Sequence, residues 1–348
     1  MEINDLLHAA VDSGASDVLL AAGAPPMFRI AGELQPANLE PLTPPALEAL
    51  CRQVLSDEQR ERLDSHRDVD FSVPVPRLGR FRFNVHWQRN SYAAAIRFIT
   101  DGVPTLDELG LPPVLEQFTR YRHGLVLVTG QTGSGKTTTL AAMIDRINRR
   151  DAKHIITLED PIEYQFAHAR SLVEQREVGK DCPSFASGLR HVLRQDPDVI
   201  LVGELRDLET IRTALQAAET GHLVLATLHS SSAGGTIDRI IEVFPAEEQG
   251  QIRAHLAECL RAIVTQRLLP AAEGRGRVAA LEILVTTRAI QTSIREASPH
   301  LIPGLISTGR RFGMQTMEQA LKELFLNGRI DADAAEEHLA EMGAAGGV

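Results

Sequence analysis

The octapeptide Gly130-Gln131-Thr132-Gly133-Ser134-Gly135-Lys136-Thr137 matches the phosphate-binding pattern G-x-x-x-x-G-K-[ST]. The apolar run directly before it, residues 125–128, predicts a buried strand. After it, Leu140, Ile144 and Ile147 recur at helical spacing, which predicts a helix that begins at the loop. A chance match to the pattern arises roughly once per hundred chains of this length, and the strand–turn–helix context makes it rarer. The sequence therefore predicts a nucleoside triphosphate site.

Each residue type in this loop suits a triphosphate. Glycine has no Cβ, so successive backbone N–H groups of the loop can converge on one phosphate. The following helix points its positive end at the same place. Lys136 adds a full charge near the β- and γ-phosphates, and the Thr137 hydroxyl can ligate Mg²⁺. We expect ATP and Mg²⁺ to bind at Gly130, Thr132, Gly133, Ser134, Gly135, Lys136, Thr137 and Thr138.

The bulk composition is that of an ordinary globular protein of two domains. The chain has 348 residues, of which 43% are hydrophobic and 24% charged, and no apolar run is long enough to span a membrane. Its start lacks the layout of a signal peptide. Three widely spaced cysteines argue against a zinc site or disulfide framework and fit a cytoplasmic location. A net charge of −10 disfavours a nucleic-acid partner.

The first 99 residues predict a small α/β domain. A 3.6-residue apolar period predicts a helix over residues 3–11, and Ser56 to Gln59 fit a capping box. Strands, expected to be antiparallel, are predicted at residues 17–20, 27–30, 69–73, 80–86 and 92–98. Arg80, Arg82, Arg89 and Arg97 alternate with apolar residues on the last two strands. They form either a solvated polar face or a source of arginine fingers for a phosphate bound elsewhere.

Residues 100–113 are rich in turn formers and predict an interdomain connection, followed by a second domain over residues 114–348. In that domain strands alternate with helices, which predicts a parallel sheet with helical crossovers. The predicted strands are residues 125–129, 154–158, 199–202 and 223–228, and the predicted helices are residues 136–149, 184–194 and 208–219. Residues 343–348 form a tail of small residues.

Polar residues follow three of these strands, at the sheet edge where ligands bind in such folds. Glu159, Asp160 and Glu163 follow the second strand, as a solvated turn or as functional acids. Glu204 follows the third strand, where an acid can hold Mg²⁺ through water and help to orient the attacking water. His229 follows the fourth strand, at the place of a γ-phosphate sensor, whereas His222 at the start of that strand is a weaker candidate.

These motifs, in this order and spacing, resemble the Walker A, Asp box, Walker B and His box of secretion-superfamily ATPases. Over nearly its whole length the chain is similar to the type IV pilus retraction ATPases, the PilT/PilU twitching-motility family. Further matching stretches are residues 14–17, 174–178, 244–248 and 313–316. The resemblance implies a PAS-like N-terminal domain, a RecA-like ATPase domain with C-terminal helices, and a homohexameric ring. It implies that Glu163 is the base that activates water, that Glu204 lies at the Mg²⁺ and water site, and that Arg82 and Arg97 are the N-terminal-domain arginines.

The implied function is a motor that retracts type IV pili, at the inner face of the cytoplasmic membrane. Its implied partners are other copies of itself and a platform protein in that membrane, with no direct insertion into the bilayer. The output surface is expected on helices at residues 252–268 and 316–326 and on residues 289–296. Two stretches depart from the family pattern. Where the family usually has Ser-Asp-Leu-His-Leu, this chain has Ser16-Asp17-Val18-Leu19-Leu20. Where the family usually has Ala-Ile-Arg-Asn-Leu-Ile-Arg-Glu, it has Ala289-Ile290-Gln291-Thr292-Ser293-Ile294-Arg295-Glu296.

Several alternatives stay open at this stage. The second departure falls on a segment tied in the family to retraction, so an accessory role beside a second retraction ATPase is an alternative. Others are a RecA-like helicase, a type II or type IV secretion or pilus-assembly ATPase, and a ring that binds ATP without turnover. A GTPase is disfavoured because the chain has no Asn-Lys-x-Asp motif. Assembly ATPases resemble longer chains with a four-cysteine metal loop.

Overall fold

The computed structural model describes residues 2–336 except 31, 77, 100, 101, 273, 275 and 334. The small-residue tail at 343–348 lies outside the described residues. The chain forms two compact units, Met1–Gly102 and a second unit from Val103 onward. Leu106 and Leu111, within the expected connection, are buried in the core of the second unit. None of the described helices is long and apolar enough to cross a membrane.

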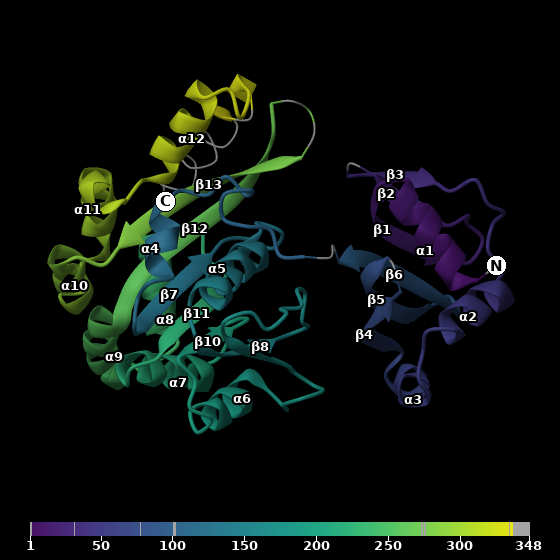
Figure 1. The fold of residues 1–348 in the computed structure, drawn as a ribbon, viewed down its shortest axis with the longest axis horizontal. Coiled ribbons are helices and arrows are strands. Elements are labelled where there is room, and N and C mark those ends of the chain that lie inside the picture. Colours follow the sequence, from purple (N-terminus) through teal and green to yellow (C-terminus); the bar gives the residue numbers. More distant parts are fainter. Residues whose placement is uncertain are drawn as a thin grey trace. The chain divides into compact units, whose positions relative to one another are not determined.

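The first unit is one six-stranded antiparallel sheet with helices packed on it (Figure 1). The strand order is β3-β2-β1-β6-β5-β4, and every neighbouring pair is antiparallel, as predicted. Its elements are α1 (Ile3–Asp12), β1 (Ala15–Ala21), β2 (Met27–Ile30), β3 (Glu33–Pro36), α2 (Pro44–Arg52), α3 (Asp57–His66), β4 (Asp68–Val75), β5 (Gly79–Gln88) and β6 (Ser91–Ile99).

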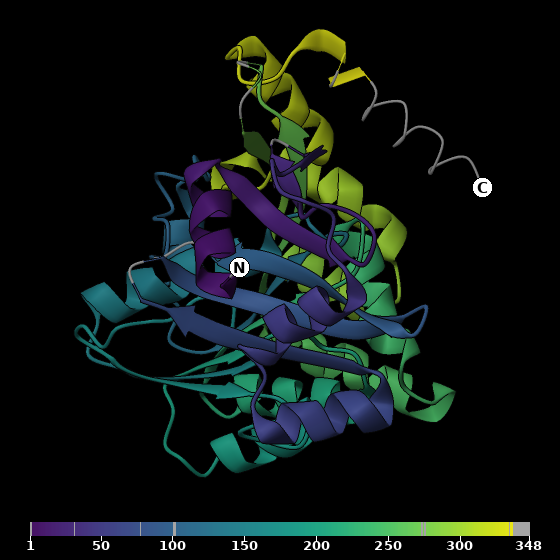
Figure 2. The same cartoon turned by 90° about the vertical axis from the view of Figure 1, so that its right-hand side faces the viewer.

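The two faces of this sheet differ because side chains alternate along each strand. Phe81, Phe83 and Val85 of β5 point into a core shared with the apolar side of α1, which crosses the strands in Figure 2. The predicted capping box of α3 is present, with Ser56 and Gln59 bonding each other's backbone N–H groups. The intervening residues of β5 lie on the opposite, polar face of the sheet.

The second unit is built on a seven-stranded sheet in the order β13-β12-β7-β11-β10-β8-β9. All neighbouring strands are parallel except the edge strand β13, so the predicted parallel sheet is confirmed. Its elements are α4 (Val114–Phe118), β7 (Gly124–Thr129), α5 (Lys136–Arg150), β8 (His154–Glu159), β9 (Leu172–Glu177), α6 (Phe185–Val192), β10 (Val199–Val202), α7 (Leu208–Glu219), β11 (Leu223–Leu228), α8 (Ala233–Glu242), α9 (Ala246–Cys259), β12 (Leu260–Pro270), β13 (Arg277–Val285), α10 (Arg288–Arg295), α11 (Ile302–Thr308) and α12 (Met317–Leu326), with 3-10 turns at Pro299–Leu301 and Arg310–Phe312.

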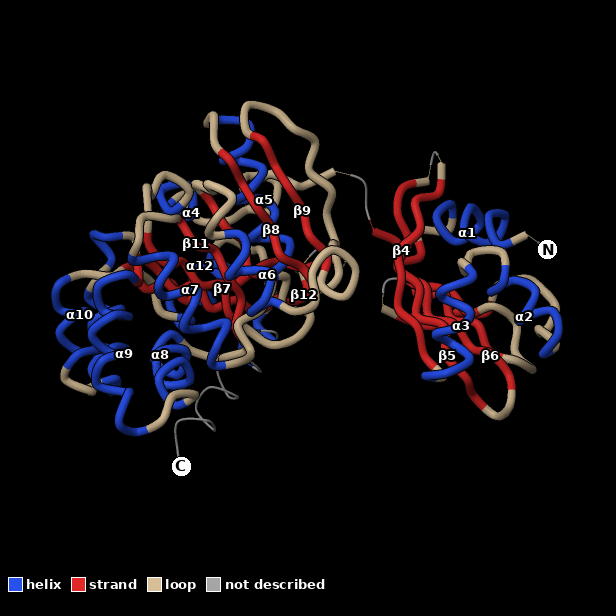
Figure 3. Tube along the Cα trace, turned by 90° about the horizontal axis from the view of Figure 1, so that it is seen from below, coloured by secondary structure: helices blue, strands red, loops and turns tan. Residues whose placement is uncertain are grey.

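Helices cover both faces of this sheet, which explains why its strands are apolar runs rather than alternating ones. Val126 and Val128 of β7 point into a core with Met143 of α5, on the face that α4 also covers. Leu125 and Leu127 point to the other face, where α6 to α11 pack. In Figure 3 the strands of this unit lie between the two sets of helices.

One sequence expectation is wrong: residues 252–268 are not a C-terminal helix. The helix α9 ends at Cys259, and Leu260–Pro270 is the strand β12, paired with β7 on one side and β13 on the other. Ala262 and Val264 point to one core and Ile263 to the other, so the strand is buried on both faces. The second expected helix, at residues 316–326, is present as α12 with a capping box at Thr316.

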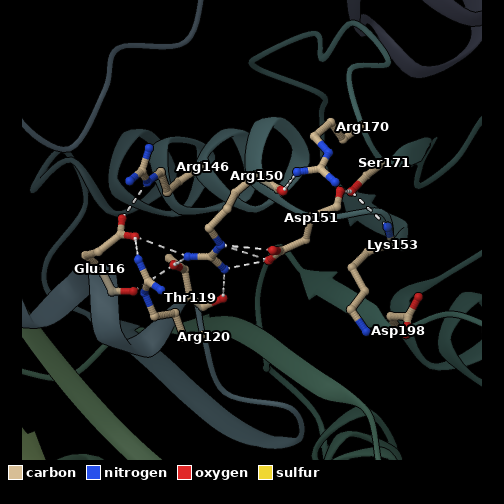
Figure 4. Close-up of polar contacts among 10 residues, drawn as sticks. All are labelled: Glu116, Thr119, Arg120, Arg146, Arg150, Asp151, Lys153, Arg170, Ser171 and Asp198. Atoms are coloured by element: carbon tan, nitrogen blue, oxygen red, sulfur yellow. Dashed lines mark hydrogen bonds and ion pairs between the residues drawn. The ribbon is translucent and has the colours of Figure 1, made fainter.

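A polar network joins α4 to the C-terminal end of α5. Figure 4 shows the Arg150 guanidinium between Glu116, Thr119 and Asp151. It donates to the Glu116 carboxylate at 3.2 Å, to the Thr119 backbone oxygen at 2.6 Å and to Asp151. Burial opposes ionisation of Glu116, but hydrogen bonds and charges from Arg146, Arg120 and Arg150 outweigh it and lower its pKa. The segment that follows the interdomain connection is thereby fixed to the helix of the phosphate-binding loop.

We predict that Arg150→Met lowers the free energy of unfolding by about 1–3 kcal/mol, because it leaves half-buried acceptors without a donor. Urea denaturation followed by circular dichroism measures the change. Arg120→Met is the matched control, since Arg120 binds the same Glu116 carboxylate but is 60% exposed. Its loss should cost at most about 1 kcal/mol. Equal effects of the two substitutions would contradict a structural role for the network.

Candidate nucleotide-binding site

The octapeptide found in the sequence forms the turn between β7 and α5, as the pattern predicts. Gly133 and Gly135 adopt φ angles of 79° and 85°, in the left-handed region that glycine favours. Gln131, Thr132 and Gly133 are exposed, whereas Lys136 at the start of α5 is buried. The Lys136 ammonium donates to the backbone oxygens of Gly130 at 3.0 Å and Gln131 at 2.9 Å. The lysine is thus held inside the loop that would surround a phosphate.

The strand β12 passes directly beneath this loop and explains two of its glycines. A Cβ at Gly130 would overlap the backbone oxygen of Gln266, and one at Gly135 would lie 2.8 Å from the Gln266 side-chain nitrogen. The Gln266 side chain, which is buried, accepts a hydrogen bond from Thr139 of α5 at 2.7 Å. Beside it, the hydroxyls of Thr129 and Thr265 lie 2.9 Å apart. Sequence reasoning missed Gln266, because it placed that segment in a helix.

Glu204 lies just after β10 and is held by an arginine and a histidine side chain. One carboxylate oxygen is 2.7 Å from an Arg206 nitrogen, and the other is 3.3 Å from Nε2 of His229, which follows β11. Burial opposes ionisation of Glu204, but the Arg206 hydrogen bond and the charges of Arg206, His229 and Lys136 lower its pKa below the ordinary range. Glu204 is therefore a carboxylate at neutral pH, the form that can hold a cation or orient water.

Glu163 lies in the loop after β8, and its surroundings link it to the phosphate-binding loop. Burial lowers the pKa of Lys136, and the Glu204 and Glu163 carboxylates oppose this shift by their charge. The Tyr164 hydroxyl next to Glu163 is 3.0 Å from the hydroxyl of Thr138 on α5. The structure therefore brings Lys136, Glu163 and Glu204 together at the carboxyl edge of the parallel sheet.

Of the other candidates, His222 has a role in the fold, and Arg82 and Arg97 belong to the first unit. Nδ1 of His222 lies 3.0 Å from the Ala217 backbone oxygen at the end of α7, which explains this histidine without a role in the site. Arg82 and Arg97 lie in the first unit, directly opposite each other on β5 and β6.

Arg82 and Arg97 each have an acidic partner on the polar face of the sheet of the first unit. The Arg97 Nε donates to Asp17 at 2.8 Å, and an Arg82 nitrogen is 3.7 Å from Asp70. The Arg97 side chain is 67% exposed and Arg82 is 36% exposed, so each guanidinium keeps free surface. Their contact with a nucleotide stays a prediction.

The divergent segment at 289–296 is α10 of the second unit with its C-cap Glu296. Ile290, Ser293 and Ile294 are buried, while Thr292 and Arg295 are exposed. The departure from the family pattern at Ser293 therefore affects packing, and that at Thr292 affects the surface.

Comparisons with known proteins identify the family of this chain. The family model described as type II/IV secretion system protein matches residues 2–300. The type IV pilus retraction ATPase PilT of Pseudomonas aeruginosa is 47% identical over 97% of this chain and 98% of its own length. The type IV pilus ATPase PilU of the same organism is 40% identical over 97% of this chain and 88% of its own.

A solved structure leads to the same family. The crystal structure of the pilus retraction motor PilT with bound ADP superposes with a TM-score of 0.90 at 47% identity, covering 97% of this chain and 96% of that one. The similarity spans both units and includes every motif of the site. The chain therefore belongs to the type II/IV secretion system protein family, and within it to the PilT/PilU family that its motifs resemble.

Proposed function

We propose that this chain hydrolyses ATP to ADP and phosphate and uses the reaction to power the retraction of type IV pili. The observation that carries the hydrolytic part is the convergence of Lys136, Glu163 and Glu204 on a glycine-rich loop at one sheet edge. The motor part rests on the full-length similarity to the retraction ATPase PilT.

Each side chain of the proposed site has its own chemical role. Lys136, which already donates to loop carbonyls, turns its ammonium to the β- and γ-phosphates when they enter the loop. Glu163 takes the proton of the attacking water as general base. His229, 3.3 Å from Glu204, lies at the end of β11 where it can sense the γ-phosphate.

The donor set of the site also fits Mg²⁺, which prefers oxygen ligands and keeps several of its waters. Thr137 would hold the ion by its hydroxyl, and Glu204 by its carboxylate, directly or through water. A bound Mg²⁺ supplies positive charge to the phosphate oxygens. The lowered pKa of Glu204 keeps this acceptor ionised at neutral pH.

The active form is proposed to be a homohexameric ring at the cytoplasmic face of the inner membrane, bound to a pilus platform protein. In this proposal the guanidinium groups of Arg82 and Arg97 are attracted to the γ-phosphate of bound ATP. They are released when the products leave. Such a difference in contacts can bias a two-state arrangement of domains. A closed ring is the usual form of head-to-tail assembly.

A second candidate is an accessory role beside another retraction ATPase. It is favoured by the divergence of α10, where Gln291 stands in place of an arginine of the family pattern. This candidate shares the hydrolytic site and differs only in whether the chain alone sustains retraction.

We predict that Lys136→Ala abolishes ATP hydrolysis in a phosphate-release assay, because it removes the positive charge placed within the loop. Lys153→Ala is the matched control: Lys153 pairs with Asp198 at 2.8 Å and is 43% exposed. This control should keep the wild-type rate. A wild-type rate in Lys136→Ala would mean that the loop is not the site of hydrolysis.

Substitutions of Glu163 and Glu204 should change different kinetic parameters. Glu163→Gln should bind nucleotide normally and lower kcat by about 10²- to 10⁴-fold, the range for loss of a positioned base. Glu204→Gln should instead raise the Mg²⁺ concentration needed for half-maximal activity, since an acceptor for the ion is weakened. Fluorescent-nucleotide binding and magnesium titrations distinguish them. Weaker nucleotide binding as the main effect of Glu163→Gln would move that residue from catalysis to binding.

For the cellular role, we expect a deletion strain to lose retraction of fluorescently labelled pili, and Lys136→Ala to fail to restore it. Because inactive subunits enter the same ring, Lys136→Ala produced alongside the wild type should lower the retraction rate. Lys153→Ala produced in the same way should not. Unchanged retraction in the deletion strain, with no second ATPase present, would overturn the motor assignment. Full retraction despite abundant Lys136→Ala would overturn the shared ring.

A further inference from the structure

The Gln175 side chain, on the edge strand β9 beside β8 (Figure 3), uses its whole amide to hold the loop that carries Glu163. Its nitrogen donates to the backbone oxygen of Tyr164 at 2.8 Å and to the carboxylate of Glu159 at 3.1 Å. Its oxygen accepts from the backbone N–H of Phe166 at 2.9 Å. One side chain thus fixes the loop at two points just after Glu163 and ties it to the end of β8.

A second side chain of β9 fixes the loop just before Glu163. The Glu177 carboxylate, whose residue is only 6% exposed, accepts from the backbone N–H of Ile162 at 3.3 Å. Its other oxygen forms an ion pair with Lys180. Residues 175 and 177 point to the same side of the strand because side chains alternate along it. The loop is therefore held on both sides of Glu163 by one face of β9.

The backbone at Glu163 itself is held through Glu159. The buried Glu159 carboxylate accepts hydrogen bonds from Thr157 at 2.6 Å, from Gln175 and from the backbone N–H of Glu163. Burial raises the pKa of Glu159, the nearby charge of Glu163 raises it further, and the hydrogen bonds from Thr157 and Gln175 oppose the shift. Gln175 is the donor that bonds both this carboxylate and the loop.

We propose that Gln175, with Glu177 as a second anchor, is a positioning residue that holds Glu163 where it can take a proton from the attacking water. This inference rests on the proposed function of Glu163 as the base. Gln175 itself touches no nucleotide in this scheme and acts only through the loop. Misplacement of a catalytic group by about 1 Å can cost on the order of 10²-fold in rate.

The test is steady-state ATPase kinetics on the full-length protein with Gln175→Glu and Gln175→Ala. Gln175→Glu keeps the size and the acceptor for Phe166 but removes both donated hydrogen bonds. We expect each variant to lower kcat by about 10- to 100-fold while KM for ATP and the affinity for fluorescent ADP stay unchanged. Glu174→Gln is the matched control, because Glu174 lies on the other side of β9, 3.3 Å from His154, and should keep the wild-type kcat.

Combination with Glu163→Gln separates positioning from a general structural effect. If Gln175 acts through Glu163, adding Gln175→Ala to Glu163→Gln should cause no further loss of kcat. A further loss of 10-fold or more, a rise in KM that accounts for the effect, or a wild-type kcat in both Gln175 variants would overturn the inference. A wild-type rate in Glu163→Gln alone would instead remove the proposed base, and the inference would fall with it. Nucleotide affinity equal to wild type shows that each variant is folded.

Discussion

The parallel alignment of β7, β8, β10 and β11 is the constraint on which the site depends. Strands that run parallel end at the same edge, so residues about 30 to 70 positions apart in the chain meet there. Lys136, Glu163 and Glu204 each follow a different strand, so the alignment of the strands brings them to one edge of the sheet. The alignment itself requires helical crossovers on both faces, and the two apolar cores above and below the sheet meet that requirement.

The first unit satisfies a different constraint, the placement of like charges. Arg82 and Arg97 face each other across an antiparallel pair, an arrangement that destabilises a sheet when nothing compensates it. Asp17 and Asp70 provide that compensation from the two flanking strands. Asp17 and Asp70 balance the charge of the two arginines, but most of the Arg97 side chain stays open to solvent.

The sequence revealed some strands of the second unit and not others. Four strands of the second unit and the helices α5, α6 and α7 were predictable, because each of these strands is a short apolar run that ends in a turn. The strand β12 was not, because it begins directly after the helix α9 with no turn between Cys259 and Leu260, and a buried strand and a buried helix segment can share the same apolar pattern. Gln266 was hidden for the same reason. Gln175 lay in a matching motif, but its role depends on contacts with Tyr164 and Phe166 that spacing cannot show.

The Arg150 network has a mechanical consequence for the two ends of α5. The covalent path between the units enters the second one at Val103 and is anchored there by Leu106 and Leu111. Glu116 then joins it to Arg150, at the opposite end of the helix from Lys136. A force on the connection would therefore reach α5 at the end opposite the phosphate-binding lysine.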